Sequence, residues 1–353
     1  MSALSYVPVL QARPHAVAAY GWLPPSDQRH IAPLWNLPPR PGAVRPALTA
    51  ELRKDLGAVS EAQRHGAAWI DAPFEDEVQE AALAELLEEY CVYGRLQPVT
   101  GPDRSPLQQS AAFAAAARGR RGIGIRVRVT GEWDAQAAEG VRVLLARAEP
   151  EDQVGLLLDM GAVLADRPDA GKEALRALDA LFPLAPWRDV CVLSGGFPRV
   201  TAEMLEHGLH QETRRDWALW HEIAQSRRAY VPLLSYGDYG TQHADAIAAV
   251  PRPPDKQGGG PDWGFLRYTT EREFVISKVL HKGREWNEKI AFNRAAAREL
   301  VELPDFRGPT AGAGETWLRD LAMGVGTTGA FAKWLTVGNA QHLAYITHTL
   351  RRL

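Results

Sequence analysis

The sequence predicts a (β/α)8 barrel of the TIM type, followed by a C-terminal extension that packs on it. Eight short apolar stretches recur along the chain, and helical segments separate them. Together they fill about 240 residues, close to the ~250 that such a barrel takes. The stretches are apolar on both faces, as parallel strands are when helices cover the sheet. A doubly wound open sheet is the competing architecture, and the number of repeats favours closure.

The predicted strands are short, and the fifth alternates apolar and non-apolar residues with a period of two. They occupy residues 6–10, 30–36, 67–71, 96–100, 122–129, 154–159, 189–194 and the first part of 230–243. In the eighth, Val231, Leu233 and Leu234 are expected to be buried. This strand ends in a polar turn with glycines at positions 237 and 240, which allow backbone conformations that bulkier residues resist.

Helical segments between the strands are predicted from apolar residues at helical spacing, as at Leu52, Leu56 and Val59. The predicted helices occupy residues 14–23, 48–64, 74–90, 105–118, 134–147, 170–182 and 212–226. A helix between consecutive strands is the connection that parallel strands need. Because the eighth strand ends this series, we expect it to close the barrel.

The chain divides into a barrel over residues 1–248 and a C-terminal extension over residues 249–353. The extension is predicted to contain a mobile loop at 251–262, a strand pair at 265–269 and 273–277, a helix at 287–302, a loop at 309–314 and helices at 315–322 and 330–351. It has too few apolar residues to fold alone. We therefore expect it to pack on the barrel and to cover part of its mouth.

The composition excludes several classes of protein. A net charge of −3 gives no overall basic field for nucleic acid, although a local patch stays open. There is no run of about 18 apolar residues, so no membrane helix is expected, and the N-terminus does not resemble a signal peptide. Cys91 and Cys191 lie far apart among apolar residues, which predicts buried free thiols and a reducing, cytoplasmic location.

Motifs for the common cofactors are missing from the sequence. It contains no His-x-His or His-Glu-x-x-His pair for zinc, no P-loop, no complete dinucleotide fingerprint and no Gly-x-Ser-x-Gly elbow. We therefore predict no cofactor. A divalent metal held by carboxylates alone stays open.

Reactive residues of such barrels lie at the carboxyl ends of the strands. Those positions hold Gln11, Arg13, Asn36, Asp71, Thr100, Arg126, Arg128, Asp159, Ser194, Asp238 and Tyr239. Acids, arginines and a tyrosine that meet at one mouth suit an anionic or sugar-like ligand. Two acids also suit general acid–base catalysis if their surroundings separate their pKa values.

Each of these residues also has a structural interpretation. Asp71 and Asp159 are explained slightly better as N-caps of the following helices than as catalytic acids. Arg126 and Arg128 share one face of their strand, and they pair with acids only if that face lines the barrel lumen. Asp238 is a candidate for ligand binding or catalysis, and in that case Asp238→Asn should leave the fold intact. It is alternatively a structural turn residue, and in that case the same change should collapse the fold.

Arg215 lies near the start of the predicted helix at 212–226, which carries tryptophans three positions apart, at 217 and 220. We interpret the two tryptophans as a packing stripe. Arg215 itself is a candidate to reach the mouth of the barrel.

Several segments occur in the order that is typical of one known family. They are Gly237-Asp-Tyr-Gly-Thr-Gln-His243, Leu266-Arg-Tyr-Thr-Thr270, Phe306 to Gly314 followed by Glu315-Thr-Trp317, Thr327-Thr-Gly329, and Lys333-Trp-Leu-Thr-Val-Gly-Asn339 with His342-Leu343. These segments resemble the beta protein family of tailed bacteriophages and bacterial chromosomes. The same family is resembled by four further segments: Tyr6-Val-Pro-Val-Leu10, Ile31-Ala-Pro-Leu-Trp35, Ser194-Gly-Gly-Phe-Pro198 and the Arg215-x-Trp-x-x-Trp220 pattern. The resemblance covers nearly the whole chain.

The resemblance implies that the extension belongs to the same unit as the barrel, and it implies no established reaction. It carries over Glu315, Asn339 and His342 as candidate positions. The chain departs from the family at two of them. An Asn-His-His sequence is here Asn339-Ala-Gln-His342, and a Trp-Gly-Asp stretch is here Ala313-Gly-Glu-Thr-Trp317. These departures weaken a catalytic role for the extension.

Two functions follow as hypotheses. The first is a hydrolase or lyase that acts on an anionic, phosphate- or sugar-containing substrate, with Asp238, Asp159, Glu315 and His342 as catalytic candidates. Its ligand-binding candidates are Asp71, Arg126, Arg128, Arg215, Tyr239, Arg267, Tyr268 and Asn339. The second is a non-catalytic phage–host interaction or defence component that binds a protein or nucleic acid. An open pocket at the mouth would favour the first, and a mouth plugged by Trp and Leu side chains the second.

Overall fold

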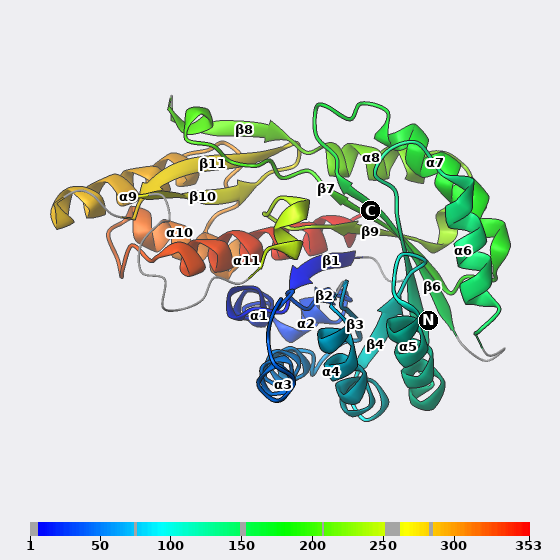
Figure 1. Ribbon diagram of the computed structural model, residues 1–353. Helices are drawn as coiled ribbons and strands as arrows, with labels where there is room; N and C mark the ends of the chain where they lie inside the picture. The colour runs from blue at the N-terminus through cyan, green and yellow to red at the C-terminus, as the bar shows by residue number, and fades with distance from the viewer. Residues whose placement is uncertain (1–5, 74–75, 149–152, 207, 251–261, 282–284) are drawn as a thin grey trace.

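The computed structural model describes residues 6–73, 76–148, 153–206, 208–250, 262–281 and 285–353. Eight parallel strands form a closed barrel in the order β1-β2-β3-β4-β5-β6-β7-β9 (Figure 1). Their bounds are Tyr6–Gln11 for β1, Leu34–Asn36 for β2, Ala68–Asp71 for β3, Leu96–Thr100 for β4, Ile123–Arg128 for β5, Val154–Ala162 for β6, Asp189–Gly195 for β7 and Leu234–Asp238 for β9. The predicted fold class is confirmed.

The strand β9 closes the barrel, as the sequence predicts. It pairs with β1 on one side, where Asp238 lies opposite Pro8, and with β7 on the other, where Asp238 lies opposite Ser194. Its start differs from the prediction, because residues Val231–Leu233 form a 3-10 turn and the strand begins at Leu234. These first apolar side chains are half-buried rather than buried.

Helices cover the outside of the barrel. They are α1 at Pro14–Gly21, α2 at Pro25–Gln28, α3 at Arg45–Ala62, α4 at Glu77–Leu87, α5 at Pro106–Gly119, α6 at Ala135–Leu145, α7 at Ala170–Leu181 and α8 at Arg215–Ala224. Local sequence sets their ends: in α5 the Ser105 side chain accepts a hydrogen bond from the amide of Gln108, and Pro106 occupies the first turn. Beyond α4, a π-helical turn spans Glu88–Val92.

The lumen of the barrel has an apolar layer below a polar one. Trp69 fills the apolar layer, and Gly124 and Gly155 make room for it, because a Cβ atom at either would lie 3.2 Å from its ring. Successive residues alternate between the faces of a strand, so Asp71 lies above Trp69 and Arg126 lies above Gly124. The alternation thus brings charged side chains to the carboxyl ends of these strands.

The C-terminal extension adds a three-stranded antiparallel sheet in the order β10-β11-β8. The strands β10 at Trp263–Thr269 and β11 at Glu273–Leu280 confirm the predicted strand pair. The third strand, β8 at His210–Thr213, comes from the part of the chain assigned to the barrel. The prediction of a helix from residue 212 is wrong at its start, because pairing with the edge of β11 holds residues 210–213 extended.

The described part of the extension also contains the α-helices α9 at Trp286–Val301, α10 at Ala313–Ala322 and α11 at Phe331–Leu350. The helix α11 lies between the sheet and the barrel, where it contacts β10, α1 and β1 (Figure 1). Most of its residues from Trp334 to Thr347 are buried, so the extension packs on the barrel as predicted. The boundary at residue 248 stays a prediction. Residues 251–261 of the predicted loop lie outside the described residues.

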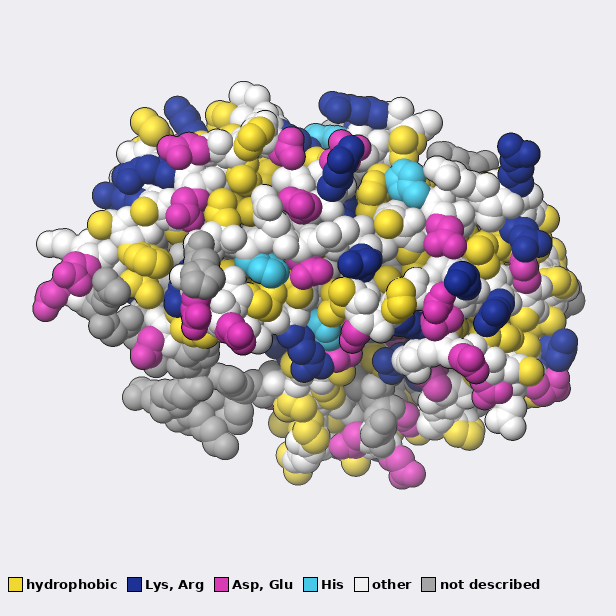
Figure 2. All heavy atoms as spheres, turned by 90° about the horizontal axis from the view of Figure 1, so that it is seen from above, with side chains coloured by type: hydrophobic (Ala, Val, Ile, Leu, Met, Phe, Trp, Pro, Cys, Tyr) yellow, Lys and Arg dark blue, Asp and Glu magenta, His cyan; other side chains and the backbone are white. Residues whose placement is uncertain are grey.

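Two observations concern the possible binding of a membrane or a nucleic acid. No helix in the described part of the chain is long and apolar enough to cross a membrane. On the face shown in Figure 2, positive and negative side chains are interspersed. Both cysteines are buried and free, as the sequence predicts.

Candidate functional site

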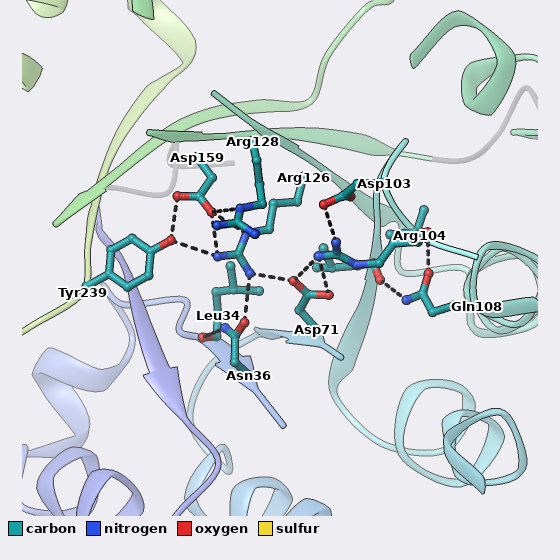
Figure 3. A network of polar contacts seen from close by, with 12 residues as sticks. Leu34, Asn36, Asp71, Asp103, Arg104, Gln108, Arg126, Arg128, Asp159 and Tyr239 are labelled. Atoms are coloured by element: carbon teal, nitrogen blue, oxygen red, sulfur yellow. Dashed lines mark hydrogen bonds and ion pairs between the residues drawn. The ribbon is translucent and has the colours of Figure 1, made fainter. Parts of the chain in front are cut away.

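The guanidinium group of Arg126 lies at the centre of a buried polar network in the barrel lumen (Figure 3). Its Nη1 atom donates to Asp71 Oδ2 at 2.6 Å and to Asn36 Oδ1 at 2.9 Å. Its Nε and Nη2 atoms donate to Asp159 Oδ2 at 3.0 and 2.8 Å, and Nη2 also donates to the Tyr239 hydroxyl at 3.0 Å. All five N–H donors of the group therefore have an acceptor.

The carboxylate of Asp159 is equally well satisfied. Its Oδ1 accepts hydrogen bonds from the Tyr239 hydroxyl at 2.6 Å and from the Gly161 amide at 2.9 Å. Burial alone would raise its pKa, but Arg126, Tyr239 and the Gly161 amide stabilise the charged form and bring the pKa below its ordinary value. Burial and Asp159 together raise the pKa of Tyr239. At neutral pH the pair is a carboxylate beside a neutral phenol.

A second arginine, Arg104, extends the network from the turn after β4. Its Nη2 donates to Asp71 at 3.0 and 3.3 Å, and its Nη1 lies 2.7 Å from Asp103. Burial would raise the pKa of Asp71, but Arg104 and Arg126 lower it below the ordinary value. The sequence prediction missed Arg104 because it follows its strand by four residues, beyond the strand-end positions.

Two alternatives raised by the sequence are now decided. The N-caps of α4 and α7 are Asp76 and Asp169, so the capping interpretation of Asp71 and Asp159 is wrong. Arg126 lies in the lumen and pairs with acids. Arg128 shares its face but is 52% exposed at the side chain, with Nε 3.9 Å from Asp159 Oδ2. It is the end of the network that reaches solvent.

Asp238 belongs to a different network, at the junction between barrel and extension. Its Oδ1 accepts from the Tyr6 hydroxyl at 3.0 Å and from the Gly240 amide at 2.9 Å, and its Oδ2 lies 2.8 Å from Nε2 of His342. The other ring nitrogen of His342 lies 2.9 Å from the Thr269 hydroxyl. Burial would raise the pKa of Asp238, but His342 and the Gly240 amide lower it below the ordinary value.

The Beta protein family model matches residues 6–348, nearly the whole chain. The chain belongs to the Beta protein family. The resemblance in the sequence is thereby confirmed.

Solved structures and curated proteins add little to this assignment. Two variants of the tryptophan synthase α-subunit from the hyperthermophile Pyrococcus furiosus are similar to the chain, each with 14% identity and a TM-score of 0.41. Each match covers 68% of this chain and 88% of the other. No curated protein matches the sequence. The structural similarity is too weak to support an argument about function.

In this Beta protein family member, two residues carried over from the family lie at the same junction. Asn339 Oδ1 accepts from the amide and hydroxyl of Thr241, at 3.1 and 2.8 Å. His342 binds Asp238, one helical turn further along α11. Between them, Gln341 exchanges two hydrogen bonds with the backbone of Thr269, at 2.8 and 3.0 Å. The helix therefore joins the polar turn after β9 to β10.

The remaining candidates do not converge with these networks. Buried Glu315 forms an ion pair with Arg307, whose amide donates to the Tyr268 hydroxyl at 3.0 Å. Tyr268 faces the apolar core of the extension, on the opposite side of β10 from Arg267. Arg215 is half-buried on α8, next to Arg214, which donates to the Tyr236 hydroxyl at 3.2 Å. Within the described residues, none of these side chains bonds to Arg126 or Asp238.

Arg267 differs from the other buried arginines. It is 4% exposed, and its guanidinium lies over the ring of Phe265, 4.0 Å from the centroid. Among the described residues, its one hydrogen bond is a long contact of 3.4 Å with the Phe265 carbonyl. Burial lowers the pKa of Arg267 to about 9, so the surroundings compensate little of its charge.

For a metal ion, the described residues offer no group of three or more His, Cys, Asp or Glu side chains in suitable positions. Asp71 and Asp159, the two acids in the lumen, are both occupied by Arg126.

Proposed function

We propose that the protein is a hydrolase or lyase that acts on an anionic, phosphate- or sugar-containing substrate at the carboxyl-end mouth of the barrel. The observation that carries the proposal is the buried group of Arg126, Asp71 and Asp159 at this end of the lumen. Buried ion networks are often no more stabilising than apolar side chains of the same volume. Charges held at the functional end of a barrel are therefore better explained by chemistry than by stability.

The roles of the residues follow from their protonation states. Asp159 is the general base, because its pKa is lowered and it stays ionised. Tyr239 is the general acid, because its pKa is raised and its hydroxyl keeps the proton. Arg126 binds both and fixes their orientation. Arg128, the exposed member, contacts the anionic group of the incoming substrate.

A second candidate function is non-catalytic binding of a protein or nucleic acid, in phage–host interaction or defence. The saturation of Arg126 favours it, because a guanidinium with all five donors engaged has none left for a substrate. In either case we propose a cytoplasmic protein, which the two free cysteines support.

The experiment that separates the two is a turnover screen over phosphate monoesters, phosphodiesters and glycosides, with wild type and Asp159→Asn. Loss of a general base predicts a rate lower by about 10²–10⁴-fold in the variant. Asp169→Asn on the exposed end of α7 is the matched control and keeps the wild-type rate. If no compound in the screen is turned over by the wild type, the enzyme proposal fails and the binding function takes its place.

A further inference from the structure

A buried cation without a counter-charge lies at the junction between the barrel mouth and the extension. In the described part of the chain, no carboxylate lies within 4.0 Å of the Arg267 guanidinium, and its Nε atom has no hydrogen-bond partner. Every other arginine discussed above that is equally buried has an acid beside it: Arg104, Arg126 and Arg214. An unpaired buried charge is costly, so its retention needs an explanation.

The position of Arg267 is well defined by packing. Its guanidinium lies near the rings of Phe265 and Phe197, with centroid distances of 4.0 and 5.8 Å. Gly338 on α11 makes room for the stem, because a Cβ atom there would lie 3.0 Å from Cβ and Cδ of Arg267. The two rings and the glycine hold the cation in one place without neutralising it.

The N-terminus of α1 supplies further positive charge to the same place. The N-cap of α1 is Arg13, its side chain makes no cap bond, and no acidic residue lies in the first turn. His15 follows in that turn, and its carbonyl accepts a hydrogen bond from the Thr336 hydroxyl of α11 at 3.2 Å. The Nη2 atom of Arg13 donates to the Ala249 carbonyl, but within the described residues its Nε atom and the Nε2 atom of His15 are buried without a partner. Helix N-termini attract anions.

The electrostatics of His15 support this proximity. Burial first, and then the positive charges of Arg13 and Arg267, lower the pKa of His15 to about 4, against a weaker opposing effect of the hydrogen bond with Gln242. Arg40 also repels the charge of Arg13, and the nearby acid Asp55 is already paired with Arg40 at 2.6 Å. The place between these groups is therefore electropositive.

We propose that Arg267, His15 and Arg13 form a binding site for a phosphate dianion, the phosphate group of a small molecule. The inference rests on the proposed function, since it gives the anionic group of the substrate a place. One turn connects the two sites: Tyr239 bonds to Arg126, and Gln242, three residues on, lies against His15. A substrate held by its phosphate at Arg267 would extend towards Asp159 and Arg128.

The test is the affinity for inorganic phosphate and for sulfate, measured by titration calorimetry at constant ionic strength against chloride. Wild type binds both anions, and Arg267→Met weakens both by at least about tenfold, the loss expected for a charge-assisted contact. Arg142→Gln on the outer face of α6 removes one exposed positive charge and keeps wild-type affinity. No binding by wild type, or unchanged binding by Arg267→Met, would overturn the site.

A second variant keeps the proposal testable if Arg267→Met does not fold. The double change Arg13→Gln and His15→Gln lies at a helix start and leaves Arg267 in place, and it also weakens phosphate by about tenfold or more. Unchanged phosphate affinity in this double variant counts against the site. Failure of the proposed function looks different: phosphate binding persists in wild type and in Asp159→Asn, while no substrate is turned over.

Discussion

Nε2 of His342 lies 2.8 Å from Oδ2 of Asp238, although 104 positions separate the two residues in the chain. The contact joins the strand that closes the barrel to the last helix of the extension. Both side chains are almost completely buried. Since the Tyr6 hydroxyl and the Gly240 amide occupy the other oxygen of Asp238, this carboxylate holds three parts of the molecule together.

Asp238→Asn is expected to destabilise the fold by about 3–5 kcal/mol, the cost of breaking a buried pair. In this variant an amide replaces the carboxylate, so one oxygen fewer is available to accept hydrogen bonds from donors such as the Tyr6 hydroxyl and the Gly240 amide. Urea unfolding of Asp238→Asn, His342→Gln and the double variant measures the effect. Because the two residues share one contact, the double variant should lose less than the sum of the single losses. Strictly additive losses would show that the contact contributes nothing.

The pH dependence of stability should follow from three buried carboxylates in the two networks. Asp71, Asp159 and Asp238 all have folded-state pKa values below the ordinary one, so each stabilises the fold above its unfolded pKa. That contribution is lost as the pH falls from about 4 through the folded values. Melting temperatures between pH 7 and pH 2 measure this loss. Asp159→Asn should flatten the acid limb of the curve, and an unchanged slope would contradict the assignment.

Arg126→Lys is expected to cost about 3–5 kcal/mol, because an ammonium group cannot replace a planar fork that serves four acceptors. Asp71 and Asp159 would be left partly unpaired in the lumen. The control is Arg128→Lys on the same strand, where the exposed side chain should change stability by less than about 0.5 kcal/mol. Equal losses in the two variants would mean that burial of the network is unimportant.

The sequence predicts the polar layer of the lumen well and the junction poorly. Strand ends and a period of two suffice to place Asp71, Arg126 and Asp159 at one mouth. Strand β8 escapes the same reasoning, because residues 210–213 are His-Gln-Glu-Thr and have no apolar pattern, and only pairing with β11 makes them a strand.

The long-range contacts at the junction are beyond local periodicity. The family resemblance pointed to Asn339 and His342, but nothing in the spacing connects them to Thr241 and Asp238. His15 carries no signal in the sequence, since a histidine in a short helix is usually a surface residue. Its meaning comes from Arg267, which lies 252 positions away in the chain.

Binding of sulfate is expected to be coupled to uptake of a proton by His15. The pKa of His15 is about 4 in the free protein, and a dianion beside it must raise that value. Sulfate affinity should therefore increase as the pH falls from 8 towards 5, whereas sulfate itself does not titrate in this range. Of the charged neighbours, Arg13 and Arg40 keep their charge throughout, and Arg267, with a pKa of about 9, is fully protonated at pH 6. Asp55, whose pKa burial raises, pairs with Arg40 and is present in wild type and in His15→Gln alike.

Calorimetry at pH 6 in two buffers with different ionisation enthalpies measures the proton directly. Wild type should take up a fraction of a proton per sulfate bound, and His15→Gln should take up none and lose the pH dependence. The same variant should lose the destabilisation between about pH 6.5 and pH 4, because protonation of a histidine with a lowered pKa favours the unfolded chain, and it should keep the acid limb below about pH 4 that Asp71, Asp159 and Asp238 set. Proton uptake that survives in His15→Gln would assign the linkage to another group and remove His15 from the phosphate site.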